Sequence, residues 1–202
     1  MTQTIDFIFD FASPNAYLAY KALPEITSIP IGEVNIIPCL LGGIFKTTGN
    51  QAPFISFANV KGKVDYEMLE FRRFIAKHQL TKFIMNPHFP VNTLLPMRGL
   101  IVAQEAGDGQ RYIEVMLKAI WEDGKNIGDE TVMLEILSDT GFDGKNILTH
   151  IKGADIKTAL IGNTNDAVAR GAFGVPTFFV GDEMFFGKDR LDQVSAVING
   201  SM

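Results

Sequence analysis

Residues 5–26 read IDFIFDFASPNAYLAYKALPEI, and this stretch decides the fold because a strand pattern runs directly into a helix pattern. The run from Ile5 to Phe11 is rich in Ile and Phe and predicts a buried strand. Ser13 suits the N-cap of the following helix, and Pro14 suits its first position. The stretch therefore predicts a strand that leads to a serine at a helix N-terminus.

The residues that follow complete a βαβ unit. A β-branched run from Val34 to Ile37 predicts a second strand, which stops at Pro38. Two strands joined through a helix normally pair in parallel. The stretch 40–54 is rich in Gly, Thr, Asn and Pro and predicts a loop with one helical turn.

The middle of the chain, from about Val64 to about Gly171, carries helical patterns and almost no strand signal. Asp129 suits the N-cap of one of its helices. The helices are expected at 64–75, 95–106, 111–122, 130–137, 145–152 and 154–170.

Strand patterns return near the carboxyl end. The stretch 173–186 contains two apolar runs around Gly181-Asp182, which suits a tight hairpin turn. A last helix carries Leu191, Val194 and Val197 at helical spacing. The order βαβ, helices, ββα predicts an α/β fold in which one sheet joins both ends of the chain and the helices form an insertion.

Composition and charge narrow the possible functions. The chain has 202 residues and a net charge of -5, which suits one domain with a large insertion. It has no basic stripe, so a nucleic-acid partner is not expected. No apolar run reaches the length of a membrane span, so a membrane partner is not expected either. The first residues, MTQTIDF, lack a secretory-signal pattern, and a cytoplasmic location is expected.

Cysteine and histidine usage excludes two further classes of site. Cys39 is the single cysteine, so no internal disulfide and no redox-active cysteine pair can form. We expect it to be buried and inert. His78, His88 and His150 show no metal-ligand spacing, so no metal site is expected.

Four motifs in order resemble one protein family: DFASP at 10–14 with YL at 17–18, LLGGI at 40–44 with GNQ at 49–51, FGVPT at 173–177, and FGKDR at 186–190. The layout resembles the thioredoxin fold with a DsbA-type helical insertion. The motifs resemble the 2-hydroxychromene-2-carboxylate isomerases and the kappa-class glutathione transferases. The resemblance implies a discontinuous thioredoxin-like, glutathione-binding domain at 1–60 and 172–202, and a helical domain at 61–171.

The resemblance gives Ser13 a chemical role. Thioredoxin-like oxidoreductases open this helix with a Cys-x-x-Cys pair, whereas this chain has Ser-Pro-Asn-Ala at 13–16. Without a thiolate in the protein, disulfide exchange is disfavoured. The resemblance implies that the Ser13 hydroxyl donates a hydrogen bond to the sulfur of glutathione. This role is compatible with a simple N-cap role, because a helix N-terminus also favours an anion.

Other motif residues are implied to hold the rest of glutathione. The family places a cis-proline at Pro176, which would present the Val175 backbone to the cysteinyl part. From the sequence alone, a trans bond would be the expectation for Pro176.

The charged motif before the last helix is implied to hold the γ-glutamyl end of glutathione through Asp189 and Arg190. Taken alone, Asp189 is a typical N-cap and Arg190 a solvated side chain. Lys188 precedes them where relatives often carry Ser or Asn, which is a departure from the family.

The resemblance implies that two further residues, Asn50 and Lys61, complete the glutathione site. Asn50 would contact glutathione, although an Asn after Gly is usually a turn residue. Lys61 would take the glycyl carboxylate, and Lys63 is the competing candidate.

Three residues are expected on the side of the second substrate, which the resemblance implies to be a small aromatic molecule. They are Asn15, Asn92 and Trp121. Asn15 departs from the family, which usually has an aromatic residue there, and a lone Trp is more often a core residue.

The sequence leaves three functions open. The first is a glutathione-dependent isomerase of an aromatic-catabolism intermediate, in which an activated thiolate adds and then leaves. The second is a kappa-class glutathione transferase or peroxidase. The third is a thioredoxin-like module that binds a partner without catalysis. The resemblance also implies a homodimer.

Overall fold

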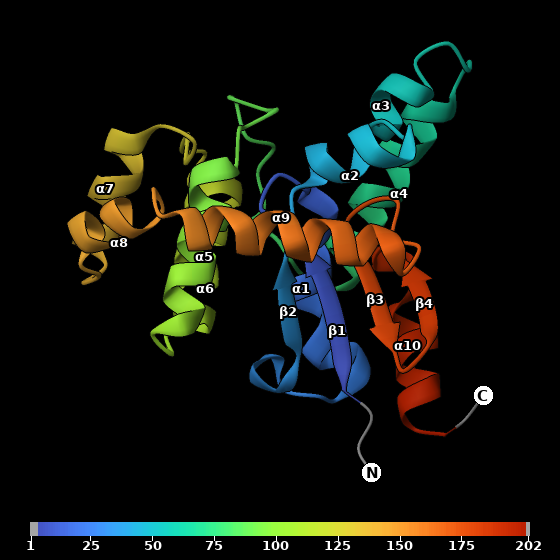
Figure 1. Cartoon of the computed structure of the whole chain (residues 1–202). Coiled ribbons are helices and arrows are strands. Elements are labelled where there is room, and N and C mark those ends of the chain that lie inside the picture. Colours follow the sequence, from blue (N-terminus) through green and yellow to red (C-terminus); the bar gives the residue numbers. More distant parts are fainter. Residues whose placement is uncertain (1–3, 201–202) are drawn as a thin grey trace.

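The computed structural model describes residues 4–200, which form a four-stranded mixed sheet surrounded by helices (Figure 1). The strand order is β2-β1-β3-β4. The strands are β1 Ile5–Phe9, β2 Asn35–Pro38, β3 Thr177–Val180 and β4 Glu183–Phe186. β1 and β2 are parallel, whereas β3 is antiparallel to both β1 and β4. One sheet therefore joins the two ends of the chain, as the sequence predicted.

Helices cover both faces of this sheet, which explains why β1 and β3 are buried runs rather than alternating ones. α1 (Pro14–Thr27) and α10 (Leu191–Ile198) pack against each other on one face. α9 (Ala154–Ala169) crosses the other face (Figure 1). Phe7 and Phe178, on neighbouring strands, have ring centroids 4.5 Å apart in the core.

The local signals in the sequence formed the structures that they predict. The Ser13 side chain accepts from the Ala16 N–H and caps α1. Asp129 caps α7 (Glu130–Asp139) by accepting from the N–H groups of the two residues after Glu130. β3 and β4 form a hairpin around Gly181, whose φ of 58° is available to glycine without strain. These predictions are confirmed.

The helical part of the chain contributes most of the remaining elements. They are α4 Lys63–Lys77, α5 Leu94–Glu105, α6 Gly109–Trp121, α7 and α8 Gly144–His150. Outside this part lie two short 3-10 helices, η1 Ile31–Glu33 and η2 Lys188–Arg190. α5 packs against α6, and α7 packs against α8. The thioredoxin-like fold with a helical insertion is confirmed, whereas the boundaries at 60/61 and 171/172 stay predictions.

Aromatic side chains link the helical part to the sheet. Trp121, at the end of α6, is fully buried, and its Nε1–H donates to the Phe11 carbonyl at 3.0 Å. Its ring stacks on Phe83, with centroids 5.8 Å apart. Trp121 therefore lies in the core and holds the segment that follows β1.

The predicted loop at 40–54 is wrong, because this stretch contains α2 (Leu41–Thr48) and the single turn α3 (Pro53–Ser56). α2 packs against α9. A Cβ added to Gly43 would come within 3.1 Å of the Thr164 Cγ2 on α9. Gly43 thus allows two helices to approach closely, and Gly49, with a φ of 72°, ends α2. Tertiary packing overrides the low helix propensity of glycine inside α2.

Among residues 4–200, no helix combines the length and the apolar character that a membrane span requires.

Candidate functional site

Ser13 lies where three parts of the fold meet at the carboxyl end of β1. Its hydroxyl donates to the Val175 carbonyl at 3.0 Å, although the two residues are 162 positions apart. The same oxygen accepts from the Ala16 N–H at 3.2 Å. Ser13 is 4% exposed. Its hydroxyl is therefore fixed between the start of α1 and the loop before β3.

The N-terminus of α1 offers an environment that suits an anion. Its first turn contains no acidic residue. Pro14 has no N–H, and among residues 4–200 the N–H of Asn15 has no hydrogen-bond acceptor. A free N–H and the positive end of the helix dipole both stabilise negative charge placed beside Ser13.

The loop opposite Ser13 contains a cis peptide bond between Val175 and Pro176. The cis bond that the family resemblance implied for Pro176 is therefore confirmed, and the trans bond expected from the sequence alone is wrong. The Pro176 carbonyl accepts from the Gly187 N–H at 2.9 Å, which fixes the loop to the segment after β4. Among the described residues the Val175 N–H has no acceptor, so it can donate to an extended peptide, as the edge of a sheet does.

Asn50 is brought to the same loop from the end of α2. Its Nδ2 donates to the Phe173 carbonyl at 2.7 Å, and its Oδ1 accepts from the Gln51 N–H at 2.8 Å. Phe173 packs against Phe186, with ring centroids 4.5 Å apart, and both side chains are exposed. Asn50 thus does more than form a turn, because it ties the α2 segment to the cis-proline loop.

The charged motif before α10 differs from its simplest interpretation. Asp189 does not cap α10, which has no side-chain cap. Both Asp189 carboxylate oxygens instead accept from the Lys188 Nζ, at 2.8 and 2.9 Å. Lys188 is 6% exposed and lies over the Phe74 ring, 5.0 Å from its centroid. The N-cap prediction is wrong because burial of the lysine ammonium requires a counter-charge, which Asp189 supplies.

Arg190 is exposed, as expected of a solvated side chain, and its guanidinium donates to the Asp189 carbonyl at 3.2 Å. η2, which carries both residues, packs against α1. The motif is therefore adjacent to the helix that begins at Ser13.

Lys61 lies on the segment that joins α3 to α4, and Lys63 is the first residue of α4, at the tip of an arm that projects from the rest of the molecule (Figure 1). Lys63 forms an ion pair with the Glu67 Oε1 at 2.6 Å and lies over the Phe57 ring. Lys61 is exposed and has no ion-pair partner among residues 4–200. Of the two, Lys61 is the one whose charge is available to a ligand.

The three residues expected near a second substrate are placed differently from one another. Asn15 is half-buried in the first turn of α1, beside Ser13. Asn92 is exposed, and its Oδ1 accepts from the Leu94 N–H at the start of α5. Trp121 is 0% exposed, so the structure places it in the core instead of on an open surface.

Asp10 is a residue of this region that the motif analysis did not single out. It is 1% exposed, and its carboxylate accepts from the Ala12 N–H at 2.9 Å, the Leu41 N–H at 2.7 Å and the Thr93 hydroxyl at 2.6 Å. Burial raises the pKa of this carboxyl above its ordinary value of 3.8, and the three donors oppose that rise. The available signal was an acidic residue directly after a strand pattern rich in Ile and Phe.

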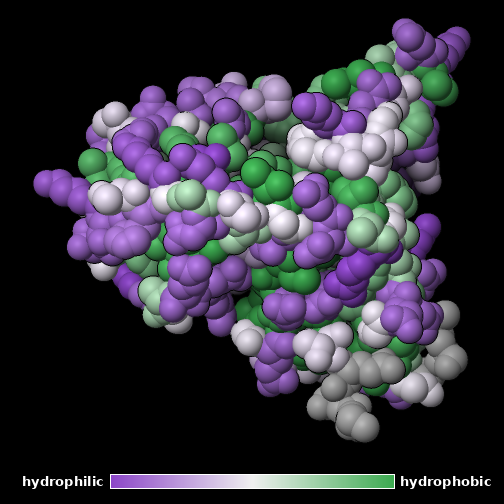
Figure 2. Space-filling model, viewed as in Figure 1, coloured by the Kyte–Doolittle hydropathy of each residue, from purple (hydrophilic) through white to green (hydrophobic). Residues whose placement is uncertain are grey.

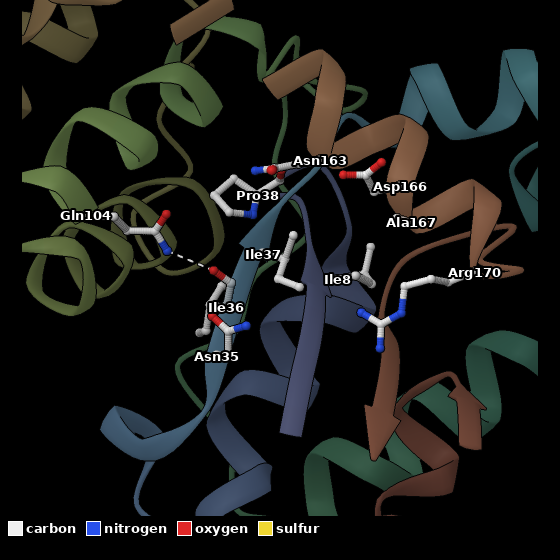
Figure 3. A pocket seen from close by; sticks show the side chains of 10 residues that line it. All are labelled: Ile8, Asn35, Ile36, Ile37, Pro38, Gln104, Asn163, Asp166, Ala167 and Arg170. Atoms are coloured by element: carbon white, nitrogen blue, oxygen red, sulfur yellow. Dashed lines mark hydrogen bonds between the residues drawn. The ribbon is translucent and has the colours of Figure 1, made fainter. Parts of the chain in front are cut away.

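The largest cavity described lies away from Ser13. Its volume is about 640 Å³, and it is lined by residues of β1, β2 and α9 together with Gln104, on the face of the sheet that α9 crosses (Figure 3). The Gln104 Nε2 donates to the Ile36 carbonyl across it. This cavity is separate from the Ser13 region and does not bear on its chemistry.

Thiol and metal chemistry of the protein itself receive no support from the described residues. Cys39 is buried, as expected, and burial raises the pKa of its thiol to about 12. Residues 4–200 contain no group of three His, Cys, Asp or Glu side chains arranged to hold a metal ion.

Comparisons with known proteins agree with this geometry. The model of the DSBA-like thioredoxin domain matches residues 4–199. A 2-hydroxychromene-2-carboxylate isomerase from Pseudomonas sp. (strain C18) is 27% identical over 199 residues, which are 98% of this chain and 91% of the relative. Glutathione S-transferase kappa 2 from Caenorhabditis elegans is 24% identical over 206 residues, which are 96% of this chain and 90% of the relative.

A solved structure supports the same fold. The structure of a 2-hydroxychromene-2-carboxylate isomerase superimposes with a TM-score of 0.81 at 24% identity and covers 98% of this chain and 95% of its own. The relatives are therefore isomerases and glutathione transferases that match this chain over nearly its whole length.

Proposed function

The chain belongs to the DSBA-like thioredoxin domain family, and we propose that it is a glutathione-dependent isomerase of the 2-hydroxychromene-2-carboxylate type. The observation that carries this proposal is Ser13, whose hydroxyl lies at the N-terminus of α1 and 3.0 Å from the Val175 carbonyl. A hydroxyl stands where a redox enzyme of this fold would need a thiol. The site is therefore suited to activating the thiol of a bound molecule.

The residues around Ser13 fit the central part of glutathione. The Val175 N–H is available to the cysteinyl backbone, and the Asn15 N–H is available to the sulfur. The Ser13 hydroxyl can turn from the Val175 carbonyl to the sulfur, because both acceptors would lie on the same side of α1. Arg190 and Asp189 would hold the γ-glutamyl end, beside Lys188, which pairs with Asp189 in the ligand-free protein. Asn50 would contact an intermediate position, and Lys61 would hold the glycyl carboxylate.

When bound, glutathione supplies a thiolate that adds to a conjugated double bond, permits rotation about it and leaves unchanged. The protein has to favour that thiolate at neutral pH, where a thiol with a pKa of about 8.5 is mostly protonated. A hydroxyl donor and a helix N-terminus that together supply about 1.4 kcal/mol lower the thiol pKa by about one unit. Donors near Asn15 and Asn92 would stabilise the negative charge that develops on the substrate oxygen.

A kappa-type glutathione transferase is the second candidate, because four curated relatives are kappa-class enzymes, two of them from Caenorhabditis elegans. The same activated thiolate would then end in a conjugate rather than in a recovered thiol. Assays with 2-hydroxychromene-2-carboxylate and with 1-chloro-2,4-dinitrobenzene separate the two candidates. A non-enzymatic binding module is the third, and it predicts turnover with neither.

We also propose that the protein is a cytoplasmic homodimer. Apolar side chains are exposed where α3 and α4 project from the molecule, at the upper right of Figure 2. They are Phe54, Ile55, Val60, Tyr66, Met68 and Leu69. A second copy of the chain would cover them. Light scattering after size exclusion tests this state, and a monomer at micromolar concentration would contradict it.

The proposed function is tested first by calorimetric titration of reduced glutathione into the wild-type protein and Ser13→Ala at neutral pH. We expect saturable one-site binding to the wild type and weaker binding to Ser13→Ala. Ser138→Ala is the matched control, because the Ser138 hydroxyl donates to the Leu134 carbonyl on an exposed helix away from the site. A folded wild-type protein that binds no glutathione at millimolar concentration would contradict the proposal.

A further inference from the structure

Asp10 connects three segments that approach the candidate site from different parts of the chain. The Ala12 N–H belongs to the turn that leads to Ser13, and the Leu41 N–H opens α2. The Thr93 hydroxyl lies immediately before α5. One buried carboxylate thus accepts from three donors that are remote from one another in the sequence.

The backbone of Asp10 adds a fourth contact to the same turn. Its carbonyl accepts from the Ser13 N–H at 3.2 Å. Side chain and backbone of Asp10 together fix the turn from 10 to 13, and with it the direction of the Ser13 hydroxyl. A rigid reacting group requires such support from the residues behind it.

Each of the three segments carries a residue of the proposed site. The turn carries Ser13, the far end of α2 leads to Asn50, and the residue before Thr93 is Asn92. Ser13 and Asn50 belong to the proposed glutathione side, and Asn92 belongs to the second-substrate side. The bond from Thr93 to Asp10 is therefore a direct link between the two sides.

We propose that Asp10 is a positioning residue that, through Thr93, fixes the second-substrate side of the site relative to Ser13. This inference rests on the proposed function, because it concerns how the two reactants of that reaction are aligned. Alignment of two reactants contributes strongly to the rate, and a displacement of 1 Å can cost about a hundredfold. Loss of the Thr93 hydroxyl should therefore impair use of the second substrate more than binding of glutathione.

The test uses Thr93→Val, which removes the hydroxyl and preserves the shape of the side chain. Thr93→Ser is the conservative variant that keeps a hydroxyl for Asp10. Thr164→Val is the matched control: Thr164 is as buried as Thr93, at 5% exposed, and its hydroxyl oxygen accepts from the Leu40 N–H, one residue before Leu41. It removes an equivalent buried hydroxyl from the same region without touching Asp10.

Two quantities are measured on all three variants: the Kd for reduced glutathione and the kcat/KM for 2-hydroxychromene-2-carboxylate at saturating glutathione. For Thr93→Val we expect kcat/KM to fall about tenfold to a hundredfold while the Kd for glutathione stays within about twofold. Thr93→Ser should restore most of the rate. Thr164→Val should lower thermal stability without this split between rate and Kd.

The outcomes separate this inference from the proposed function. An active wild-type protein in which Thr93→Val and Thr164→Val behave alike would overturn the role of Asp10 and leave the proposed function intact. A parallel loss of glutathione binding and rate in Thr93→Val would also overturn it, because that pattern indicates general loss of structure. A wild-type protein that neither binds glutathione nor turns over the substrate would overturn the proposed function and this inference with it.

Discussion

The proposed glutathione site has two parts that are built very differently. Around the sulfur position, Ser13 and Val175 are buried and joined by a hydrogen bond between distant parts of the chain. Around the two charged ends of glutathione, the contacts depend on Asp189 and Lys61, whose side chains are largely exposed. The first part is fixed by the core of the fold, whereas the second depends on solvated charges.

This difference indicates where chemistry and recognition reside. A hydroxyl that activates a thiol must keep its direction, so it requires a helix cap, a carbonyl partner and the Asp10 carboxylate behind it. Charged side chains at the surface can adjust to a ligand, but each contributes little because water screens it. Changes at the buried part should therefore have the larger effects.

The strongest test of the comparison is the rate of Ser13→Ala. Loss of the hydroxyl removes one donor to the thiolate, and kcat should fall by up to about tenfold, because the hydroxyl and the helix N-terminus together lower the thiol pKa by about one unit. The pKa of the bound thiol, followed through thiolate absorbance, should rise. Ser138→Ala should match the wild type, and a Ser13→Ala enzyme with normal kcat would show that the buried part is not where the chemistry occurs.

The pH dependence of stability tests the carboxylate behind Ser13. Burial raises the pKa of Asp10 above 3.8, so the folded protein keeps this proton at pH values where the unfolded chain has lost it. The stability that Asp10 contributes is therefore fully present below pH 3.8 and is lost as the pH rises through the folded-state pKa, at up to about 1.4 kcal/mol per pH unit.

Asp10→Asn isolates this contribution. The Asn side chain of the variant does not ionise. Its NH2 group would oppose the Leu41 N–H, so that two donors meet without an acceptor, which costs about 1–3 kcal/mol of stability. The variant should therefore be most destabilised relative to the wild type at low pH, and the gap should narrow as the pH rises. Denaturant unfolding between pH 3.5 and pH 7 measures the difference in unfolding free energy between the wild type and Asp10→Asn. A difference that stays constant over this range would refute the raised pKa of Asp10.

The charged part is tested by Lys188→Met. The Lys188 ammonium donates to both oxygens of the Asp189 carboxylate. It therefore competes with the ammonium group of glutathione, which would bind the same carboxylate. Its removal frees Asp189, and glutathione should bind about fivefold more tightly, a modest gain for an exposed carboxylate. Asp189→Asn should weaken binding, and if both variants bind as the wild type does, the γ-glutamyl end does not lie at this motif.

The smallest effect is expected for Lys61→Ala. An exposed lysine that meets the glycyl carboxylate contributes about 0.2–1 kcal/mol, so the Kd for glutathione should rise about 1.4-fold to fivefold. Lys63→Ala is the matched control, because Lys63 is already paired with Glu67. A larger effect in Lys63→Ala than in Lys61→Ala would reverse the assignment of the two lysines.

Local patterns determined much of the architecture. The strand and helix at 5–26, the caps Ser13 and Asp129 and the hairpin around Gly181 could be predicted because each depends on neighbours within a few residues. The four ordered motifs also point to the family, because each is a short local pattern and their order along the chain is preserved. The glycine-rich stretch at 40–54 suggested a loop, because the close approach that Gly43 allows is to Thr164 on α9, far away in the sequence.

What the sequence determined by itself is the order of the elements and the serine at the helix start. The tertiary structure alone decided that Val175 faces Ser13, that Asp10 collects donors from three segments and that Lys188 is buried against Phe74. These contacts join residues far apart in the chain, so no local periodicity or propensity encodes them. They exist only because the packed core brings the strand ends and helix starts together, and buried polar groups must then find partners there.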